Sequence, residues 1–246
     1  MAMMLRMKYF SLCIVMISLL SACAKTQERM SNSPKDDYQY AQGLMDNNDY
    51  ARATVFLEKF SGKHPYSEYA AKAEMLRLYA AYKDEEYILS ETLAIRFLKQ
   101  HPRHADLAYV QYMLAMSYIK ESGDSERDQT ATHHAMDALK RLLKKYPDSK
   151  YTAEAAQYLQ KMRNKLAQHE LYVGQFYYQY ERYVAAANRF QVVMNKYQTS
   201  PAIEEALYYL SASYMQLKLT QNAKDVAAIL RHNFPNSGWS EKAASL

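Results

Sequence analysis

The chain has 246 residues, of which 49% are hydrophobic and 23% charged, with a formal net charge of +5. This length allows a sizeable core, and so mild a positive excess gives no argument for a nucleic-acid partner. The two cysteines, Cys13 and Cys23, both lie within the first 23 residues, so the rest of the chain has no thiol for a disulfide, a metal site or a nucleophile.

Residues 1–22 have the pattern of a bacterial signal peptide. Arg6 and Lys8 give a positive start, and the apolar run that follows from residue 9 to residue 20 is shorter than the roughly 20 residues that span a membrane. The run ends in Leu-Ser-Ala followed by Cys23, which resembles the lipobox of bacterial lipoproteins. Cys23 is therefore the predicted acylation site, carrying diacylglycerol (palmitate-type chains) and an N-acyl chain; an ordinary signal peptide with a chance cysteine is the alternative. Because residue 24 is Ala rather than Asp, the resemblance implies sorting to the outer membrane.

The lipidated cysteine is followed by a polar stretch, and residues 23–36 are expected to form a flexible tether. These residues carry almost no large apolar side chains and cannot bury enough surface to order themselves. A flexible chain of this length spans roughly 20 Å. The folded body is therefore expected just off the membrane, with the lipid as its anchor.

From residue 37 onward the sequence predicts helices throughout. It is rich in good helix formers, and sustained apolar–polar alternation of the kind that marks strands is missing. Five of the six prolines follow apolar-periodic stretches, at positions 65, 102, 147, 201 and 235. Their spacings of 37, 45, 54 and 34 residues indicate an internal repeat of helix–turn–helix units.

The repeat matches the tetratricopeptide (TPR) pattern, in which small and large side chains alternate between two closely crossing helices. The fourth unit matches best, with Gly174 and Tyr177 on its first helix and Ala186 and Phe190 on its second. The predicted fold is an all-α TPR superhelix of about five units that share one continuous core, with a generic helical bundle as the alternative. Units 1–3 cover residues 37–148 and units 4–5 cover residues 149–246. One long helix over residues 151–180 joins the halves, and a polar, exposed insertion over residues 120–131 lengthens unit 3.

The sequence offers no catalytic constellation, and we expect neither an enzyme nor a cofactor. Two histidine pairs, His101 with His104 and His133 with His134, invite a zinc hypothesis. The first pair flanks a proline without a carboxylate at ligand spacing, and adjacent histidines on a helix point about 100° apart. A metal site is therefore not expected, although a histidine-based metal enzyme remains an alternative class.

Function must then lie in surfaces, and the 24 tyrosines are the most informative residues. Tyrosine buries its ring while its hydroxyl keeps a hydrogen bond, so it suits the binding of other chains. Most of these tyrosines are expected in the core. Five fall on first helices, one turn away from the packing positions, and are candidates for a concave peptide-binding groove: Tyr38, Tyr79, Tyr82, Tyr178 and Tyr208.

The whole chain, with its lipobox, short tether and five TPR units, resembles the BamD (ComL) family. That family supplies the lipoprotein subunit of the outer-membrane β-barrel assembly machinery, the BAM complex. The phrases at residues 40–44, 49–53, 66–70 and 145–149 are similar to the family's units. The resemblance covers nearly all of the chain that follows the lipobox.

The resemblance implies a non-enzymatic scaffold at the periplasmic face of the outer membrane that assists protein insertion into the membrane. It implies C-terminal units that hold the POTRA region of the barrel subunit BamA and contact accessory BAM lipoproteins. Its N-terminal units are expected to receive targeting segments of unfolded outer-membrane proteins. Asn188 and Arg189 match a family position linked to BamA. The sequence stops at Leu246, which leaves open which accessory subunits bind, and another TPR lipoprotein for pilus or cell-envelope assembly is the alternative.

Overall fold

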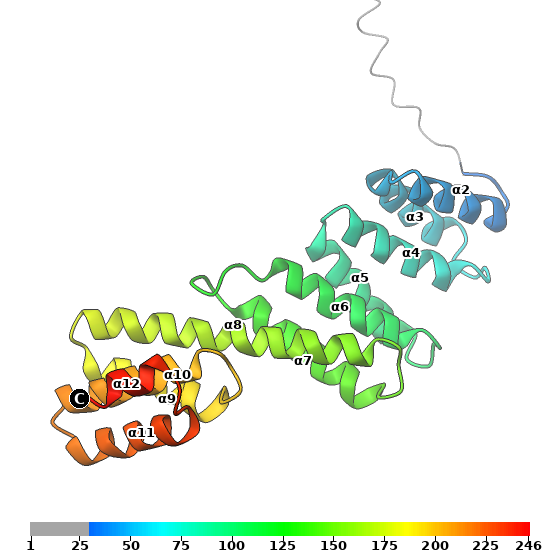
Figure 1. The fold of residues 1–246 in the computed structure, drawn as a ribbon. Coiled ribbons are helices and arrows are strands. Elements are labelled where there is room, and N and C mark those ends of the chain that lie inside the picture. Colours follow the sequence, from blue (N-terminus) through cyan, green and yellow to red (C-terminus); the bar gives the residue numbers. More distant parts are fainter. Residues whose placement is uncertain (1–29) are drawn as a thin grey trace, which may run out of the picture.

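The computed structural model describes residues 30–246, so the predicted signal peptide and Cys23 lie outside the described residues. The described part is all-α, as predicted, and consists of five consecutive helix–turn–helix units and a short last helix (Figure 1). The helices are α2 (Pro34–Asp46), α3 (Tyr50–Lys63), α4 (Ala70–Lys83), α5 (Tyr87–Gln100), α6 (Leu107–Glu121), α7 (Thr130–Lys145), α8 (Thr152–Gln179), α9 (Tyr183–Lys196), α10 (Ile203–Gln216), α11 (Thr220–Asn233) and α12 (Gly238–Ala243).

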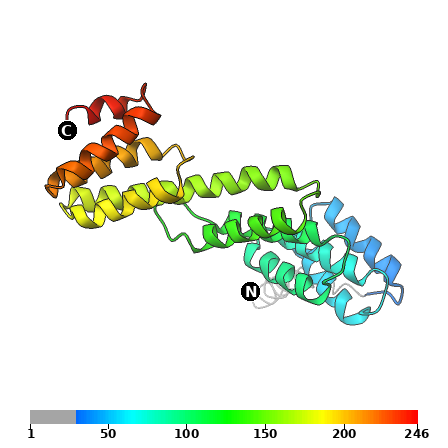
Figure 2. The same cartoon turned by 90° about the horizontal axis from the view of Figure 1, so that it is seen from below.

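The units stack in chain order into an elongated array, with α2 near one end and α12 at the other (Figures 1 and 2). Each helix packs mainly on the helices before and after it in the sequence. This arrangement is typical of a solenoid, because one helix pair cannot bury its apolar face alone. Within residues 30–246, no helix combines the length and apolar character that crossing a bilayer requires.

In units 1, 2, 4 and 5 a turn of three residues joins the two helices. The middle residue has a left-handed backbone with φ between 58° and 64°, at Asn48, Glu85, Glu181 and Lys218. In each turn the next N–H donates to a carbonyl five residues earlier, as Asp49 does to Leu44 at 2.9 Å. The left-handed residue thus reverses the chain and satisfies the open carbonyls at the end of the first helix.

The turns between units also share one geometry, and it corrects the predicted end of unit 4. A residue at the end of the second helix accepts a hydrogen bond at 2.9–3.2 Å from the N–H three residues later; these residues are His64, His101, Tyr146, Tyr197 and Phe234. In four of these turns the next residue is proline. In unit 4, Gln198 follows Tyr197 instead, and Pro201 lies three residues after Gln198. Pro201 was therefore the wrong marker. The equivalent positions 65, 102, 147, 198 and 235 are 37, 45, 51 and 37 residues apart.

The two lengthened spacings have separate causes. In unit 3, residues 122–129 replace the three-residue turn. In unit 4, α8 has 28 residues where α10 has 14, as expected from the unbroken helical pattern. The first part of α8 packs on α7 and the later part on α9, so this helix joins the two halves (Figure 2).

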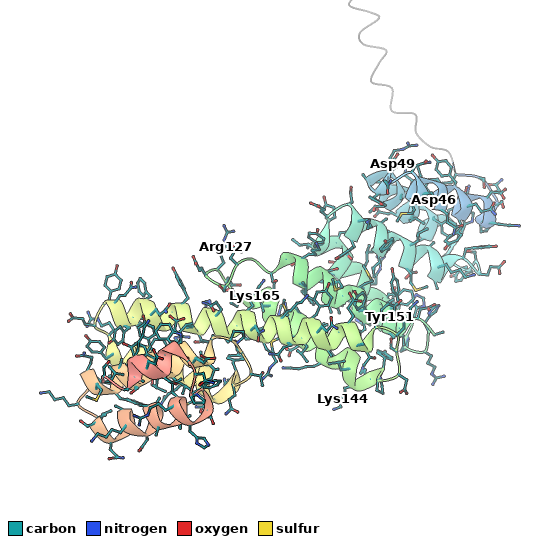
Figure 3. The ribbon with its side chains drawn as sticks, viewed as in Figure 1. Asp46, Asp49, Arg127, Lys144, Tyr151 and Lys165 are labelled. Atoms are coloured by element: carbon teal, nitrogen blue, oxygen red, sulfur yellow. The ribbon has the colours of Figure 1, made fainter. Side chains whose placement is uncertain are left out.

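The insertion folds back onto α8 and is not simply the exposed polar loop that the sequence suggested. The Lys165 ammonium donates to the carbonyls of Ser122 at 3.3 Å and Gly123 at 2.9 Å. One turn further along α8, His169 Nδ1 lies 2.6 Å from the Ser125 carbonyl. Figure 3 shows Lys165 beneath the loop that carries Arg127. The insertion therefore braces the helix that connects the halves.

The buried apolar residues form two clusters, so the expectation of one continuous core was wrong. One cluster covers unit 1 and includes Ala73 and Ala80 of α4. The other runs from α4 to α12 and includes Leu78 and Ala81 of the same helix. Between these two sets lies the buried Arg77, whose guanidinium interrupts apolar packing.

Residues 30–33 are fixed to unit 1, so the tether ends earlier than residue 36. α2 already begins at Pro34, and the Ser31 N–H donates to the Asp37 carboxylate at 2.7 Å. The same buried carboxylate lies 2.9 Å from His64 Nε2. Lys63 donates to the Met30 carbonyl at 3.0 Å. The backbone is therefore held to the folded body from residue 30 onward.

Candidate functional site

Two of the predicted groove tyrosines line the same cavity. Tyr38 of α2 and Tyr79 of α4 border an open cavity of about 280 Å³ together with Tyr109 of α6. The remaining lining residues are Lys72, Met75, Leu76 and Asp106. Rings from the first helices of three successive units thus face one depression, as expected for the concave side of a solenoid.

The tyrosine surface continues from this cavity toward the start of α8. The Tyr109 ring centroid lies 5.9 Å from that of Tyr151, and the Tyr112 ring stacks on Tyr151 at 4.8 Å with an angle of 20°. Tyr151 stands immediately ahead of α8 (Figure 3). Tyr82, the third candidate of the N-terminal half, is half-buried and contacts the Tyr87 ring at 5.5 Å. We call this surface, from Tyr38 to Tyr151, the tyrosine groove.

Four tyrosines of the tyrosine groove have a raised pKa. Burial raises the pKa of Tyr109 far above its usual range, and it does the same for Tyr112, whose hydroxyl also bonds Glu154. Burial likewise raises the pKa of Tyr38 and Tyr82. A neutral phenol can donate a hydrogen bond while its ring offers an apolar face. The groove can thus bind apolar and aromatic side chains and satisfy backbone carbonyls beside them.

The two candidates of the C-terminal half have different surroundings. Tyr178 contacts the rings of Tyr183 at 5.4 Å and Tyr209 at 5.3 Å. Tyr208 lies 5.2 Å from the ring of Trp239, which belongs to α12. We call these five rings the aromatic cluster. Its rings pack on one another and stay half-buried, and none of them lines the cavity that Tyr38 and Tyr79 border.

Asn188 and Arg189 lie on α9 but face different neighbours. Arg189 Nη1 pairs with the Glu170 carboxylate of α8 at 3.1 Å, and 43% of its side chain stays exposed. Asn188 is exposed and lines a separate cavity of about 460 Å³ with Val184 and Leu217. The pair is therefore not one compact site, because adjacent helical residues point about 100° apart.

Sequence reasoning missed an exposed aromatic ridge at the end of α8, formed by Tyr172 and Phe176 of the helix and by Tyr180, which directly follows it. The repeat places a small residue at the position of Phe176 in the other units: Gly43, Ala80, Ser117 and Ser213. Ser213 is 0% exposed, whereas Phe176 is 49% exposed. The lengthened α8 carries this part of the helix beyond α7, so no preceding second helix covers it. A phenylalanine at a small-residue position was the signal that could have revealed the ridge.

The histidines have structural partners. His101 lies 3.2 Å from the Glu74 carboxylate and 4.5 Å, between ring centroids, from Phe97. His64 repeats this arrangement in unit 1 with Asp37 and Phe60. Among residues 30–246, no group of three potential metal ligands is close enough to hold an ion. These histidines therefore connect the end of a second helix to the first helix of the same unit.

Comparison with known proteins assigns the family. The model described as "YfiO: Outer membrane lipoprotein" matches residues 30–230. The chain belongs to this family, that of BamD. The outer membrane protein assembly factor BamD of Rickettsia prowazekii is 32% identical over 203 residues, which cover 82% of this chain and 81% of the relative. The BamD of Neisseria meningitidis serogroup A is 30% identical over 248 residues, covering 94% and 93%.

Among solved structures, a thermophilic TPR protein of Thermus thermophilus covers 87% of this chain and 98% of that chain, with 13% identity and a TM-score of 0.39. Membership of the BamD family makes the chain an outer membrane lipoprotein and a non-enzymatic assembly factor of the BAM complex. The predicted family, class and location are thereby confirmed, and the pilus-assembly and metal-enzyme alternatives are excluded. Acylation of Cys23 stays a prediction, since it lies outside the described residues.

Proposed function

We propose that the tyrosine groove receives segments of unfolded outer-membrane proteins, while units 4 and 5 hold the POTRA region of BamA. The observation that carries the first part is the cavity shared by Tyr38, Tyr79 and Tyr109. It is open, it is formed by three units, and its only charged lining residues are Lys72 and Asp106. Such a surface suits a largely apolar chain whose backbone still needs hydrogen-bond partners.

The spacing of the units indicates what kind of segment fits. First helices of neighbouring units in a solenoid are separated by roughly 10 Å, the usual distance between packed helices. An extended chain advances about 3.3 Å per residue, so residues about three apart would meet successive units. An aromatic side chain of the segment could then enter the cavity while the next one contacts Tyr112 or Tyr151. Recognition would follow side-chain type and spacing rather than one fixed sequence.

Site-specific photo-crosslinking tests the groove. A photoreactive phenylalanine at position 79 should crosslink to an unfolded outer-membrane protein added to the full chain. The matched control is position 66, since Tyr66 is 100% exposed but lies in a turn away from the cavity. Equal crosslinking from both positions would mean that the unfolded chain binds nonspecifically, and the proposal would be wrong.

The second part of the proposal concerns Arg189 and Asn188. Arg189 uses one nitrogen on Glu170, and its partly exposed guanidinium can still bind a carboxylate of BamA. The cavity beside Asn188 is also lined by Glu181, which directly follows the ridge residue Tyr180, and by Val184, whose side chain is 61% exposed. A charged contact next to uncovered apolar rings is typical of a protein interface. Accessory BAM lipoproteins are proposed to use the same C-terminal units.

Charge reversal tests the contact with BamA. Arg189→Glu should weaken binding to the purified POTRA region at least about tenfold, because like charges at an interface cost several kcal/mol. Helical content should stay unchanged, since Arg189 is partly exposed. Arg103→Glu, at an exposed arginine in the turn between units 2 and 3, is the control and should bind normally. Unaltered binding by Arg189→Glu would remove this residue from the interface.

The anchor is part of the proposed mechanism. Seven residue steps separate Cys23 from Met30, where attachment to unit 1 begins, and a chain of that length reaches at most about 25 Å. Unit 1, and with it the start of the groove, would then stay close to the membrane that receives the barrels. Cys23→Ser should fold and bind BamA in solution yet assemble barrels more slowly in cells. Full-rate assembly by this variant would show that the anchor is dispensable.

A further inference from the structure

One residue of α4 departs from the repeat in a way that packing does not explain. The position of Arg77 is apolar or aromatic in every other unit: Tyr40, Leu114, Val173 and Leu210. Leu114 is 4% exposed and Leu210 is 0% exposed, and Arg77 is nearly as buried at 7%. Unit 2 thus buries a guanidinium where units 3 and 5 bury a leucine, whereas Tyr40 of unit 1 is 42% exposed.

Burial of this charge is only partly compensated. Arg77 Nη2 pairs with the Glu58 carboxylate of α3 at 3.1 Å, but Glu58 itself is 64% exposed. Arg77 Nε is buried and has no hydrogen-bond partner among the described residues. A buried ion pair stabilises a fold no better than apolar side chains of similar volume, and an unsatisfied donor adds a further cost. Fold stability is therefore a poor reason for an arginine at this position.

The unsatisfied guanidinium lines an open cavity of about 310 Å³ between α3, α4 and α5. The other lining residues are Glu58, Ser61, Glu74, Arg96 and Gln100. This cavity lies on a different side of α4 from the tyrosine groove, which Leu76 and Tyr79 line. Glu74 is hydrogen-bonded to His101 at 3.2 Å, whereas Arg96 makes no ion pair within residues 30–246. Two guanidiniums therefore share a cavity in which only Glu58 pairs with either of them.

We propose that Arg77 and Arg96 form a binding site for a single carboxylate of a protein segment, and that Glu58 occupies this site internally until the segment binds. A guanidinium presents a planar fork of N–H donors that matches two carboxylate oxygens. Glu58 shows the match within the chain, and its exposure leaves it free to turn away into solvent. The carboxylate can come from an acidic side chain or from a chain terminus. The site is separate from the tyrosine groove and does not depend on the proposed function.

Charge balance favours a carboxylate over a phosphate. The cavity lining holds two arginines and two glutamates. A monoanion that replaces Glu58 leaves the local charge unchanged, and the glutamate regains its hydration in solvent. A phosphate dianion would add a negative charge beside Glu74, where like charges repel. The charge of the cavity lining therefore favours a carboxylate over a phosphate.

The test follows the Arg77 Nε–H resonance of the isotope-labelled chain by NMR at constant ionic strength. The probes are the side-chain carboxylate of N-acetylglutamate amide, the terminal carboxylate of N-acetylalanine, inorganic phosphate and chloride. Saturable shifts with either carboxylate, and weaker or no shifts with phosphate and chloride, are expected; the two carboxylate probes distinguish a side chain from a terminus. Equal response to phosphate, or no response to either carboxylate, would overturn the proposal.

Two variants separate binding from structure. Glu58→Gln should tighten carboxylate binding about two- to fivefold, the worth of an exposed ion pair that no longer competes. Arg77→Leu restores the residue of units 3 and 5, so it should abolish binding while the melting temperature stays equal or rises. Arg231→Gln is the control for general charge and should bind as the unaltered chain does. A lower melting temperature for Arg77→Leu, with Glu58→Gln binding no tighter, would make Arg77 a structural residue only.

Discussion

The N-terminal and C-terminal halves use the same repeat but treat their tyrosines in opposite ways. In units 1–3, Tyr38, Tyr79 and Tyr109 border an open cavity. In units 4 and 5, Tyr178 and Tyr208 belong to a cluster whose rings pack on one another and on α12. The flanking rings differ as well: α12 supplies Trp239 to the C-terminal cluster, whereas Tyr69 packs on Tyr38 and Tyr151 on Tyr112 at the borders of the N-terminal cavity. The repeat therefore determines the helical scaffold, while the segments that flank each half influence which tyrosine rings line an open cavity.

The same comparison separates the half that we propose binds unfolded chains from the half that we propose holds BamA. One core is continuous from α4 to α12 and crosses the junction between the halves, whereas unit 1 has its own small core. In a solenoid, stability is close to a sum of units and their interfaces. Perturbations should therefore act mainly on the unit in which they are made and on its neighbours, and the following variants test this from the largest expected effect to the smallest.

Phe190→Ala should have the largest effect, because it removes a fully buried ring of the C-terminal half. A loss of about 3–5 kcal/mol is expected from the missing burial and the cavity left behind. Trp239, the only tryptophan of the chain, reports on this half by fluorescence during urea unfolding. Its transition should move to lower urea while the tyrosine groove still binds. Loss of groove binding in the same variant would mean that the halves are not independent.

Gly174→Ala tests how closely α8 and α9 approach. A Cβ atom at this position would lie 2.4 Å from the Phe190 ring, so the ring or the helices must shift. We expect destabilisation of about 1–3 kcal/mol, as for other overpacked cores. Gly43→Ala in unit 1 is the matched control, because no atom lies within 4 Å of its added Cβ. Equal losses of free energy of unfolding in both variants would contradict the close helix contact.

Asp37→Asn tests the attachment of residues 30–33 in the N-terminal half. Burial alone would raise the pKa of Asp37, but hydrogen bonds from His64 and Ser31 outweigh it and lower the pKa below 3.8. Such a carboxylate stabilises the fold above its unfolded pKa, and this stabilisation is lost as pH falls through the folded pKa. The variant should lose about 1–3 kcal/mol at neutral pH, the cost of a broken buried hydrogen bond to a charged group.

The measurement for Asp37 is amide hydrogen exchange of residues 30–33 between pH 6 and pH 3. The unaltered chain should lose protection of these amides only as pH falls through the lowered pKa of Asp37, whereas Asp37→Asn should lack protection throughout. Trp239 fluorescence should respond to neither change, since it reports on the other half. Equal protection of these amides in the two chains at pH 6 would rule out the carboxylate as the attachment point.

The smallest effect is expected from the left-handed turn residues, which both halves share. Glu85→Gly and Lys218→Gly relieve a backbone conformation that costs a residue with a Cβ about 1–2 kcal/mol, against the entropy that glycine loses on folding. Each should therefore gain at most about 1 kcal/mol of unfolding free energy. Similar gains in the two halves would show that the turns do not contribute to the difference between them, and a gain in one half alone would show that they do.

Much of the fold could be predicted because it follows local periodicity. The long helix over α8 and the packing of Gly174 against Phe190 follow from apolar spacing and small–large pairing. The end of unit 4 was misplaced because Gln198 stands where the other units have proline, and the backbone turn forms without it. The split core was missed because a sequence pattern does not show that Arg77 is buried rather than turned to solvent.

The candidate site was only partly predictable for a related reason. Position on a first helix made Tyr38, Tyr79, Tyr178 and Tyr208 candidates alike, but only Tyr38 and Tyr79 line the cavity. The surroundings of Tyr178 and Tyr208 depend on Tyr209 and Trp239, and Trp239 belongs to a separate helix that contacts the cluster only after the chain has folded. Contacts between units, and not the repeat itself, decide which rings stay open.

The most direct test compares one ring from each half in the same binding measurement. Fluorescence anisotropy of a labelled, unfolded outer-membrane protein would give its affinity for Tyr79→Ala and for Tyr208→Ala. Tyr79→Ala should weaken binding about tenfold or more, as expected for an aromatic contact at the centre of an interface. Tyr208→Ala should leave the affinity unchanged and alter only the fluorescence of Trp239. Equal weakening by the two variants, or none by Tyr79→Ala, would contradict the proposal that unfolded chains bind at the tyrosine groove and not at the aromatic cluster.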